Sequence, residues 1–154
     1  MPIGDTIITV AGNLTADPDL RYTTNGTAVA SFTVAASRRV YDADASQWRD
    51  GDTLFLRCSA WRQLAEHAAE SLTKGTRVLV TGRLRQREYE TADGQKRTVY
   101  EVDADDLGPS LRFATAKIAK TARATAPHPA DMAGEPWAAA PAAEPAGAGT
   151  APPF

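Results

Sequence analysis

Residues 53–90 of this 154-residue chain read TLFLRCSAWRQLAEHAAESLTKGTRVLVTGRLRQREYE, and the changes of period within them decide the fold. From Thr53 to Ala60 every second residue is apolar, which is the period of a half-buried strand. After Trp61 the apolar residues follow helical spacing, and Lys74-Gly75 supplies a C-terminal stop. The two-residue period then returns from Arg77 to about Glu90. This stretch therefore predicts a strand, a short helix and another strand.

The flanking residues supply the remaining strands. Asn25-Gly26 and Asp93-Gly94 are hairpin signals, and a polar loop is expected from about Asp42 to Asp52. The other predicted strands are Ile3–Ala11, Ala28–Ser37, Thr98–Ala104 and an additional one over Leu111–Ile118. Three strands, one short helix and two further strands are the order of an all-β, five-stranded oligonucleotide-binding barrel, here with an extra C-terminal strand.

The composition changes near Ala119, beyond which Ala, Pro, Gly and Thr dominate. Such a segment buries too little apolar surface to offset its ordering entropy. We therefore predict a barrel domain over residues 1–119 and a disordered Ala/Pro-rich tail over residues 120–154. The formal charge is −2 overall, and three acids beyond Arg123 with no Lys or Arg make that part of the tail −3 and everything before it +1.

Several classes of protein are disfavoured by what the sequence lacks. No apolar run approaches the ~18–20 residues that span a bilayer, and no signal sequence begins the chain, so a cytoplasmic protein is expected. Cys58 is the only cysteine and is expected to be a small buried residue. His67 lies on the apolar stripe of the helix, where a core or interface histidine is expected. With no phosphate-binding loop and no nucleophile elbow, we expect no catalysis, no metal and no cofactor.

The outward faces of the two strands around the helix combine aromatic rings with arginines. These residues are Phe55, Arg57 and Trp61 on the first strand, and Arg83, Arg85, Arg87 and Tyr89 on the second. Unpaired bases stack on aromatic rings with ~1–3 kcal/mol each, while cations hold the phosphates. The pattern predicts sequence-tolerant binding of single-stranded nucleic acid. The alternative is that the three rings lie in a subunit interface and that the arginines form a solvated face.

More basic and aromatic residues lie in or beside the two expected hairpin loops. They are Arg38, Arg39, Tyr41, Trp48 and Arg49 in the first, and Lys96 and Arg97 in the second. Long basic loops that carry an aromatic residue can fold over a bound strand. The alternative for Trp48 is a loop residue that packs on its own barrel.

A long ordered set of residues then points to a known family. It comprises Gly12-Asn13-Leu14-x-x-Asp17-Pro18-x-x-Arg21-Tyr22-x-x-Asn25-Gly26, Phe32-Thr33-Val34-Ala35, Trp61 with Leu64-Ala65-Glu66, and Leu72-x-Lys74-Gly75-x-x-Val78-x-Val80-x-Gly82-x-Leu84-Arg85. From about Pro2 to Lys117 the chain resembles bacterial single-stranded DNA-binding proteins. The resemblance implies a homotetramer, associated with the nucleoid, that protects single-stranded DNA in replication, recombination and repair.

The resemblance also assigns individual positions. Phe55, Trp61 and Tyr89 match the family's stacking aromatics, with Phe55 and Tyr89 in place of tryptophans of well-known members, and Val40 occupies a further aromatic position beside Tyr41. The stretch from Ser110 to Lys117 resembles actinobacterial members, which add a strand that clamps subunits together.

The C-terminal tip departs from the family pattern. The main replicative members end in several Asp residues and a Pro-Phe tip that docks into basic pockets on partner proteins. Here Ala151-Pro152-Pro153-Phe154 keeps the tip without the acids. We therefore expect an accessory paralogue, whose Pro153 and Phe154 make only a weakened contact with replication or repair proteins. A barrel that became a protein-interaction module, or one that binds RNA, remains an alternative function.

Overall fold

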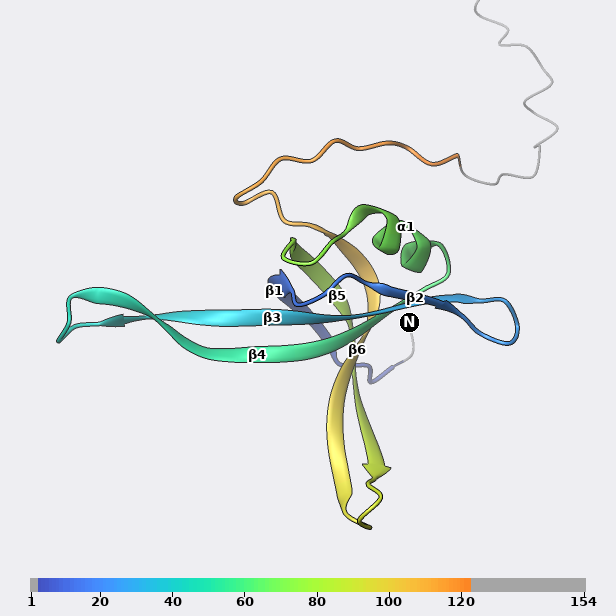
Figure 1. Ribbon diagram of the computed structural model, residues 1–154, viewed down its shortest axis with the longest axis horizontal. Coiled ribbons are helices and arrows are strands. Elements are labelled where there is room, and N and C mark those ends of the chain that lie inside the picture. Colours follow the sequence, from blue (N-terminus) through green and yellow to red (C-terminus); the bar gives the residue numbers. More distant parts are fainter. Residues whose placement is uncertain (1–2, 123–154) are drawn as a thin grey trace, which may run out of the picture. The chain divides into compact units, whose positions relative to one another are not determined.

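The computed structural model describes residues 3–122, and the residues up to Lys117 form one compact unit (Figure 1). Its elements in chain order are β1 (Ile7–Leu14), β2 (Asp19–Tyr22), β3 (Ala28–Asp42), β4 (Gln47–Trp61), α1 (Gln63–Ser71), β5 (Arg77–Glu90) and β6 (Lys96–Pro109). The helix lies between β4 and β5, where the change of period predicted it. None of the helices in the described part of the chain combines the length and the apolar character needed to cross a membrane.

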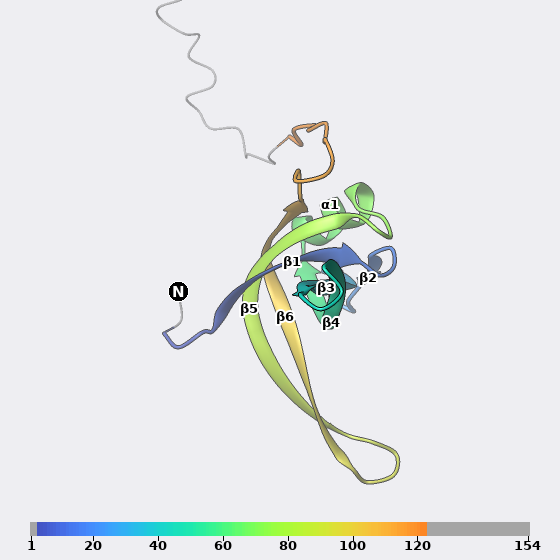
Figure 2. The same cartoon turned by 90° about the vertical axis from the view of Figure 1, so that its left-hand side faces the viewer.

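The strands close into a barrel. They pair in the order β1-β5-β6-β4-β3-β2, and an additional β1–β3 pairing joins the sheet to itself. Asn13 and Leu14 of β1 pair with β3 in this closure. Gly12 permits it, because a Cβ at that position would collide with the carbonyl oxygen of Ala35. The result is a five-stranded barrel of β1, β5, β6, β4 and β3 with the short β2 added beside β3, which confirms the predicted fold class (Figure 2).

The barrel core is built from alternate residues of each long strand. Its buried members are Leu14, Ala28, Ala30, Phe32, Val34, Leu56, Cys58, Ala60, Val78, Val80, Val102 and Ala104, together with Ala65, Ala68 and Leu72 from the helix and its C-terminal end. The two-residue alternation predicted for β3 is thus confirmed from Ala28 to Val34. Since alternation sends the intervening residues outward, the core also determines which side chains the strands present to solvent.

Two hairpins extend further than their sequences indicate (Figures 1 and 2). The segment expected to be a loop from Asp42 to Asp52 is mostly strand, because β3 continues to Asp42 and β4 begins at Gln47. The strand expected over Thr98–Ala104 runs from Lys96 to Pro109. We call residues 38–52 the β3–β4 arm and residues 85–100 the β5–β6 arm. Most side chains in both arms are exposed, so the arms lack an apolar alternation although their backbones still pair.

The additional strand predicted over Leu111–Ile118 is wrong for the single chain. A turn and a bend occupy residues 111–113, and residues 114–122 have no regular secondary structure. The last backbone bond to the barrel runs from the Ser110 amide to the Arg77 carbonyl oxygen, 2.8 Å apart. Alternating side chains alone do not form a strand, because the backbone also needs a partner edge. The disorder predicted for the tail lies mainly outside the described residues, and the boundary at residue 119 stays a prediction.

Cys58 lies inside the barrel, as expected, with a side chain that solvent does not reach. Burial raises the pKa of its thiol from 9.0 to about 12, because the thiolate would lose its hydration. Between these pH values the unfolded chain releases a proton that the folded chain keeps. We therefore expect the free energy of unfolding to fall by about 1.4 kcal/mol per pH unit from this group as pH rises above 9.

Chemical denaturation of the wild-type chain and of Cys58→Ala at several pH values between 8 and about 11 measures this contribution. The wild-type chain should lose stability faster than the variant as pH increases, because only the wild-type chain carries the buried thiol. Parallel stability curves would contradict the expectation.

Candidate nucleic-acid interface

One outward face of the barrel carries six of the predicted binding residues, drawn from β4 and β5. We define the outer face by Phe55, Arg57 and Ser59 of β4, Glu101, Asp103 and Asp105 of β6, and Arg83, Arg85, Arg87 and Tyr89 of β5. The strand register aligns Arg57 with Glu101 and Glu101 with Arg85. It likewise aligns Ser59 with Asp103 and Asp103 with Arg83. Residues aligned across neighbouring strands point to the same side of the sheet, so these side chains share one surface.

A hollow of about 570 Å³ opens at the end of the outer face where the two hairpin arms diverge. Phe55 and Arg57 line it from β4, and Arg87 and Tyr89 line it from β5. Phe55 is 65% exposed and Tyr89 is 46% exposed, although both are large rings. The remaining lining residues are Leu54, Leu56, Val99, Tyr100 and Glu101. Exposed rings beside guanidinium groups form a platform on which unpaired bases can stack.

A second hollow, of about 620 Å³, lies at the other end and contains Trp61. Arg83 and Asp105 line this hollow and belong to the outer face, so the two regions are continuous. The Trp61 ring is 46% exposed. Trp61 follows Phe55 by six positions, which places their backbone positions about 20 Å apart along β4. The remaining residues around this hollow are Thr23, Asn25, Thr27, Arg62, Leu64 and Ala104.

Each arginine of the β5 row lies beside a carboxylate of β6. Arg83 Nη2 is 3.3 Å from Asp105 Oδ1, and Arg85 Nε is 3.2 Å from Asp103 Oδ2. Arg87 Nε is 3.7 Å from Glu101 Oε2. Within β5 no acid lies between these arginines. The prediction from the sequence therefore did not include the acids of β6 that the hairpin brings beside them. The signal was present, because Glu101, Asp103 and Asp105 alternate along a strand that the Asp93-Gly94 turn folds back onto the arginines.

The residues predicted in the first hairpin loop lie on the β3–β4 arm, away from the outer face. They are Arg38, Arg39, Tyr41 and Trp48, with Arg49 beside them. Tyr41 and Trp48 pack edge to face with ring centres 5.4 Å apart. Trp48 remains 62% exposed on the arm, so the alternative that it packs on the barrel is wrong.

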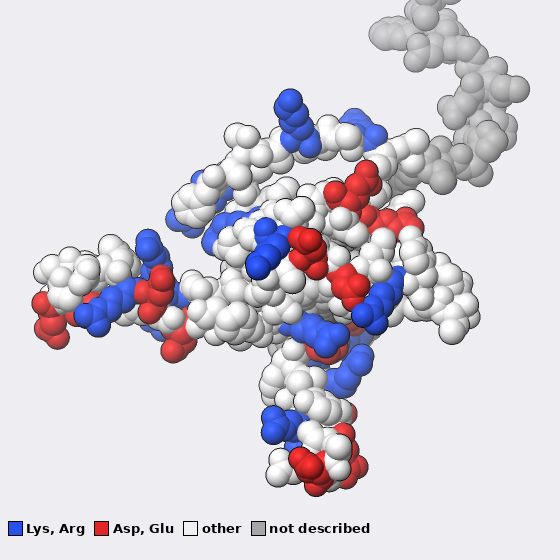
Figure 3. Space-filling view, in the orientation of Figure 1, with Lys and Arg blue, Asp and Glu red and all other residues white. Residues whose placement is uncertain are grey.

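Charges of both signs follow the two arms (Figure 3). On the β3–β4 arm, Arg39 lies 3.5 Å from Asp50, and Arg49 lies 3.0 Å from Asp42. On the β5–β6 arm, Lys96 begins β6 and Arg97 pairs directly with Tyr89. The structure therefore brings Arg97 next to a predicted stacking ring. Pro153 and Phe154 lie outside the described residues.

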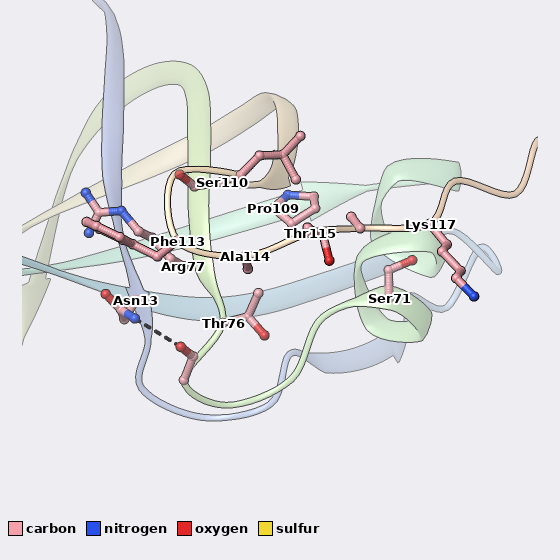
Figure 4. A pocket seen from close by; sticks show the side chains of 13 residues that line it. Asn13, Ser71, Thr76, Arg77, Pro109, Ser110, Phe113, Ala114, Thr115 and Lys117 are labelled. Carbon is pink, nitrogen blue, oxygen red and sulfur yellow. Dashed lines mark hydrogen bonds between the residues drawn. The ribbon is translucent and has the colours of Figure 1, made fainter.

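Another hollow, of about 680 Å³, lies between the barrel and the segment that follows β6 (Figure 4). Arg77 and Phe113 line it, with the guanidinium carbon 5.7 Å from the ring centre. Asn13 donates a hydrogen bond from Nδ2 to the Gly75 carbonyl oxygen, 3.0 Å away. This hollow is lined by one aromatic ring, that of Phe113, and shares no residue with the outer face. It therefore offers no row of stacking positions.

No group of three or more His, Cys, Asp or Glu side chains suited to a metal ion occurs within residues 3–122. His67 is partly buried on α1. Apart from Ser59, the side chains that the outer face presents are aromatic rings and charged groups.

Comparison with known proteins agrees with this geometry. A model of the single-strand binding protein family matches residues 6–110. This chain belongs to the single-strand binding protein family. The matched range contains β1 to β6 and every residue of the outer face, so the family resemblance identified from the motifs is confirmed.

Individual members of the single-strand binding protein family are similar over most of the chain. The single-stranded DNA-binding protein of Mycobacterium tuberculosis strain H37Rv is 53% identical over 162 aligned positions, covering 98% of this chain and 99% of the relative. That of Mycolicibacterium smegmatis is 62% identical over 120 positions, covering 78% of this chain and 73% of the relative. The crystal structure of a small single-stranded DNA-binding protein from Streptomyces coelicolor has a TM-score of 0.63 and 35% identity, covering 71% of this chain and 97% of that one.

Proposed function

We propose that this chain binds single-stranded DNA without sequence preference and protects it during replication, recombination and repair. The observation that carries the proposal is the hollow in which the exposed rings of Phe55 and Tyr89 adjoin Arg57 and Arg87. Stacking requires bases whose faces are uncovered, and every base has such a face. The proposed ligand is therefore single-stranded DNA of any sequence. We place this binding in the cytoplasm.

The proposed binding mode divides the work between two kinds of side chain. Phe55, Trp61 and Tyr89 accept bases, and the arginines Arg57, Arg83, Arg85 and Arg87 contact phosphates. An arginine has five N–H donors, and the carboxylate contacts of Arg85 and Arg87 are made at Nε. In the proposed binding mode, the donors on the terminal nitrogens of these two side chains bind phosphate oxygens. Arg38, Arg39, Tyr41, Trp48, Lys96 and Arg97 extend the proposed contact along the arms.

Titration with oligo-dT tests the proposal, with tryptophan fluorescence and the mobility of a labelled oligonucleotide as the two readouts. We expect quenching, because Trp61 would stack on bases, and a slope of log affinity against log salt of about −0.7 per neutralised phosphate. Trp61→Phe should bind with reduced quenching, since it keeps a ring at the site. An absence of both quenching and mobility shift would reject the proposal, and tighter binding of a matched RNA would favour an RNA-binding barrel.

We also propose that four copies assemble into a homotetramer. The segment that follows β6 supports this, because Leu111 is 65% exposed and Phe113 is 79% exposed in the single chain. Apolar side chains without cover are typical of surfaces that another chain buries. In this proposal the segment predicted as a strand pairs only when a second copy supplies the partner edge.

A contact with replication or repair proteins through Pro153 and Phe154 completes the proposal. No acid lies within the last ten residues, so this contact lacks the charge-assisted attraction of the main replicative members. The role of an accessory paralogue stays a prediction of the sequence.

A further inference from the structure

The acidic row of β6 has no place in the proposed binding mode, although it lies in the middle of the outer face. Glu101, Asp103 and Asp105 are flanked by β5 on one side, and the first two are paired with β4 on the other. Arg57 and Ser59 lie between Phe55 and Trp61 on β4 and are aligned with Glu101 and Asp103. A strand of DNA that follows β4 from Phe55 to Trp61 therefore lies beside these carboxylates. Like charges facing one another across an interface weaken association and exclude unsuitable partners.

The row cancels most of the positive charge of the outer face. Among the residues that define the outer face, four arginines and three carboxylates leave a net charge of +1. Arg97, which is aligned with Tyr89, adds one further positive charge on the arm. Three of the arginines have a carboxylate within 4.0 Å, and among residues 3–122 only Arg57 of the four has none. A phosphate that approaches Arg83, Arg85 or Arg87 therefore meets a guanidinium that is already partly neutralised.

A duplex and a single strand depend differently on this charge. A duplex hides its base faces, so a non-specific protein surface attracts it through its phosphates. A single strand adds stacking on the exposed rings, which does not depend on the net charge of the surface. Removing positive potential therefore costs a duplex nearly all of its attraction but leaves a single strand with its stacking contacts.

We propose that Glu101, Asp103 and Asp105 determine ligand selectivity by lowering the phosphate attraction of the outer face, so that only strands with bases free to stack bind tightly. This inference rests on the proposed function and assigns it a further set of residues. The acids lower the affinity for duplex DNA, while the rings raise the affinity for single-stranded DNA.

The test is the full-length variant Glu101→Gln/Asp103→Asn/Asp105→Asn, titrated with oligo-dT and with a duplex of equal length at two salt concentrations. We expect duplex affinity at low salt to rise roughly ten-fold and oligo-dT affinity to rise less. Three newly uncompensated arginines should steepen the salt slope by up to about 2.7 for duplex and about 2.1 for the single strand. The ratio of single-strand to duplex affinity should therefore fall.

Two further variants control the experiment. Asp19→Asn/Glu66→Gln/Glu70→Gln changes the net charge of the protein by the same amount as the triple variant, but on β2 and α1, outside the outer face. It should leave the ratio of single-strand to duplex affinity close to that of the wild-type chain. Asp105→Asn alone, at the most exposed carboxylate of the row, should shift both affinities in the same direction by a smaller amount. It also provides a result if the triple variant does not fold.

Each outcome decides between the ideas. Unchanged or weaker binding by the variants, or equal gains for both ligands, would overturn the inference and assign the acids a role in holding the arginines. An equal change of the ratio in the control would also overturn it. A wild-type chain that binds neither ligand would instead reject the proposed function, and this inference with it.

Discussion

Replacing Phe55 and Tyr89 together by alanine should reduce affinity for oligo-dT more than any other pair of substitutions on the outer face. Each ring that stacks on a base contributes about 1–3 kcal/mol, which corresponds to roughly 5- to 150-fold in affinity. Both rings line the same hollow and are exposed, so their removal deletes stacking surface and leaves the barrel core intact. The double variant should lose at least about 30-fold, measured by titration at constant salt.

A matched control separates stacking from a general loss of aromatic surface. Tyr22 is 60% exposed on β2, so Tyr22→Ala removes a comparable ring from outside the outer face and should change the affinity by less than about two-fold. If the rings instead belong to a subunit interface, the double variant will change the sedimentation behaviour of the protein while the affinity per site stays the same. That result would contradict the stacking role.

Gly82→Ala should be the most destabilising small substitution in the barrel. Gly82 lies in β5 beside the irregularity of the β5–β6 ladder, and a Cβ there would collide with the carbonyl oxygen of Asp103. It would also lie 2.8 Å from the Ala104 Cα. Both obstacles are backbone atoms, so relief requires that β6 shift. We expect a loss of about 3 kcal/mol in the free energy of unfolding and a melting temperature lower by roughly 10 °C.

Gly108→Ala provides the comparison for thermal or denaturant unfolding. A Cβ at Gly108 meets no atom within 4 Å, and its backbone conformation is not one reserved for glycine. Its stability should therefore stay within about 1 kcal/mol of the wild-type chain. Equal stability of the two variants would show that β6 can move away from β5 without cost.

The parts of the fold that follow from local alternation could be predicted from sequence. Phe32 and Val34 face the core, while Phe55 and Trp61 face outward, because the period of two leaves no other arrangement once one face is buried. At Leu54 the alternation no longer predicts burial. It shares the pattern of Leu56 but is 55% exposed, because β4 has already left the barrel for the arm at that point.

Features that depend on pairing between distant strands could not be predicted in this way. The carboxylates at Glu101 and Asp103 approach Arg85 and Arg87 only through the β5–β6 register. The sequence pattern of one β-strand carries no information about the charges on the neighbouring β-strand. The same reason explains the segment after β6, where alternation from Leu111 to Ile118 indicated a strand although the segment pairs with no strand within residues 3–122.

The strand β5 runs without a break from Val78, in the middle of the core, to Tyr89 on the arm. From Arg85 onward all of its residues are exposed. Amide protons should therefore exchange slowly at the start of this strand, where opening requires the barrel to unfold, and faster toward its end, where the hairpin frays by itself. A ligand that lies along β5 would therefore contact a rigid backbone near Arg83 and a flexible one near Tyr89. The flexible end can adjust its position to bases of different size.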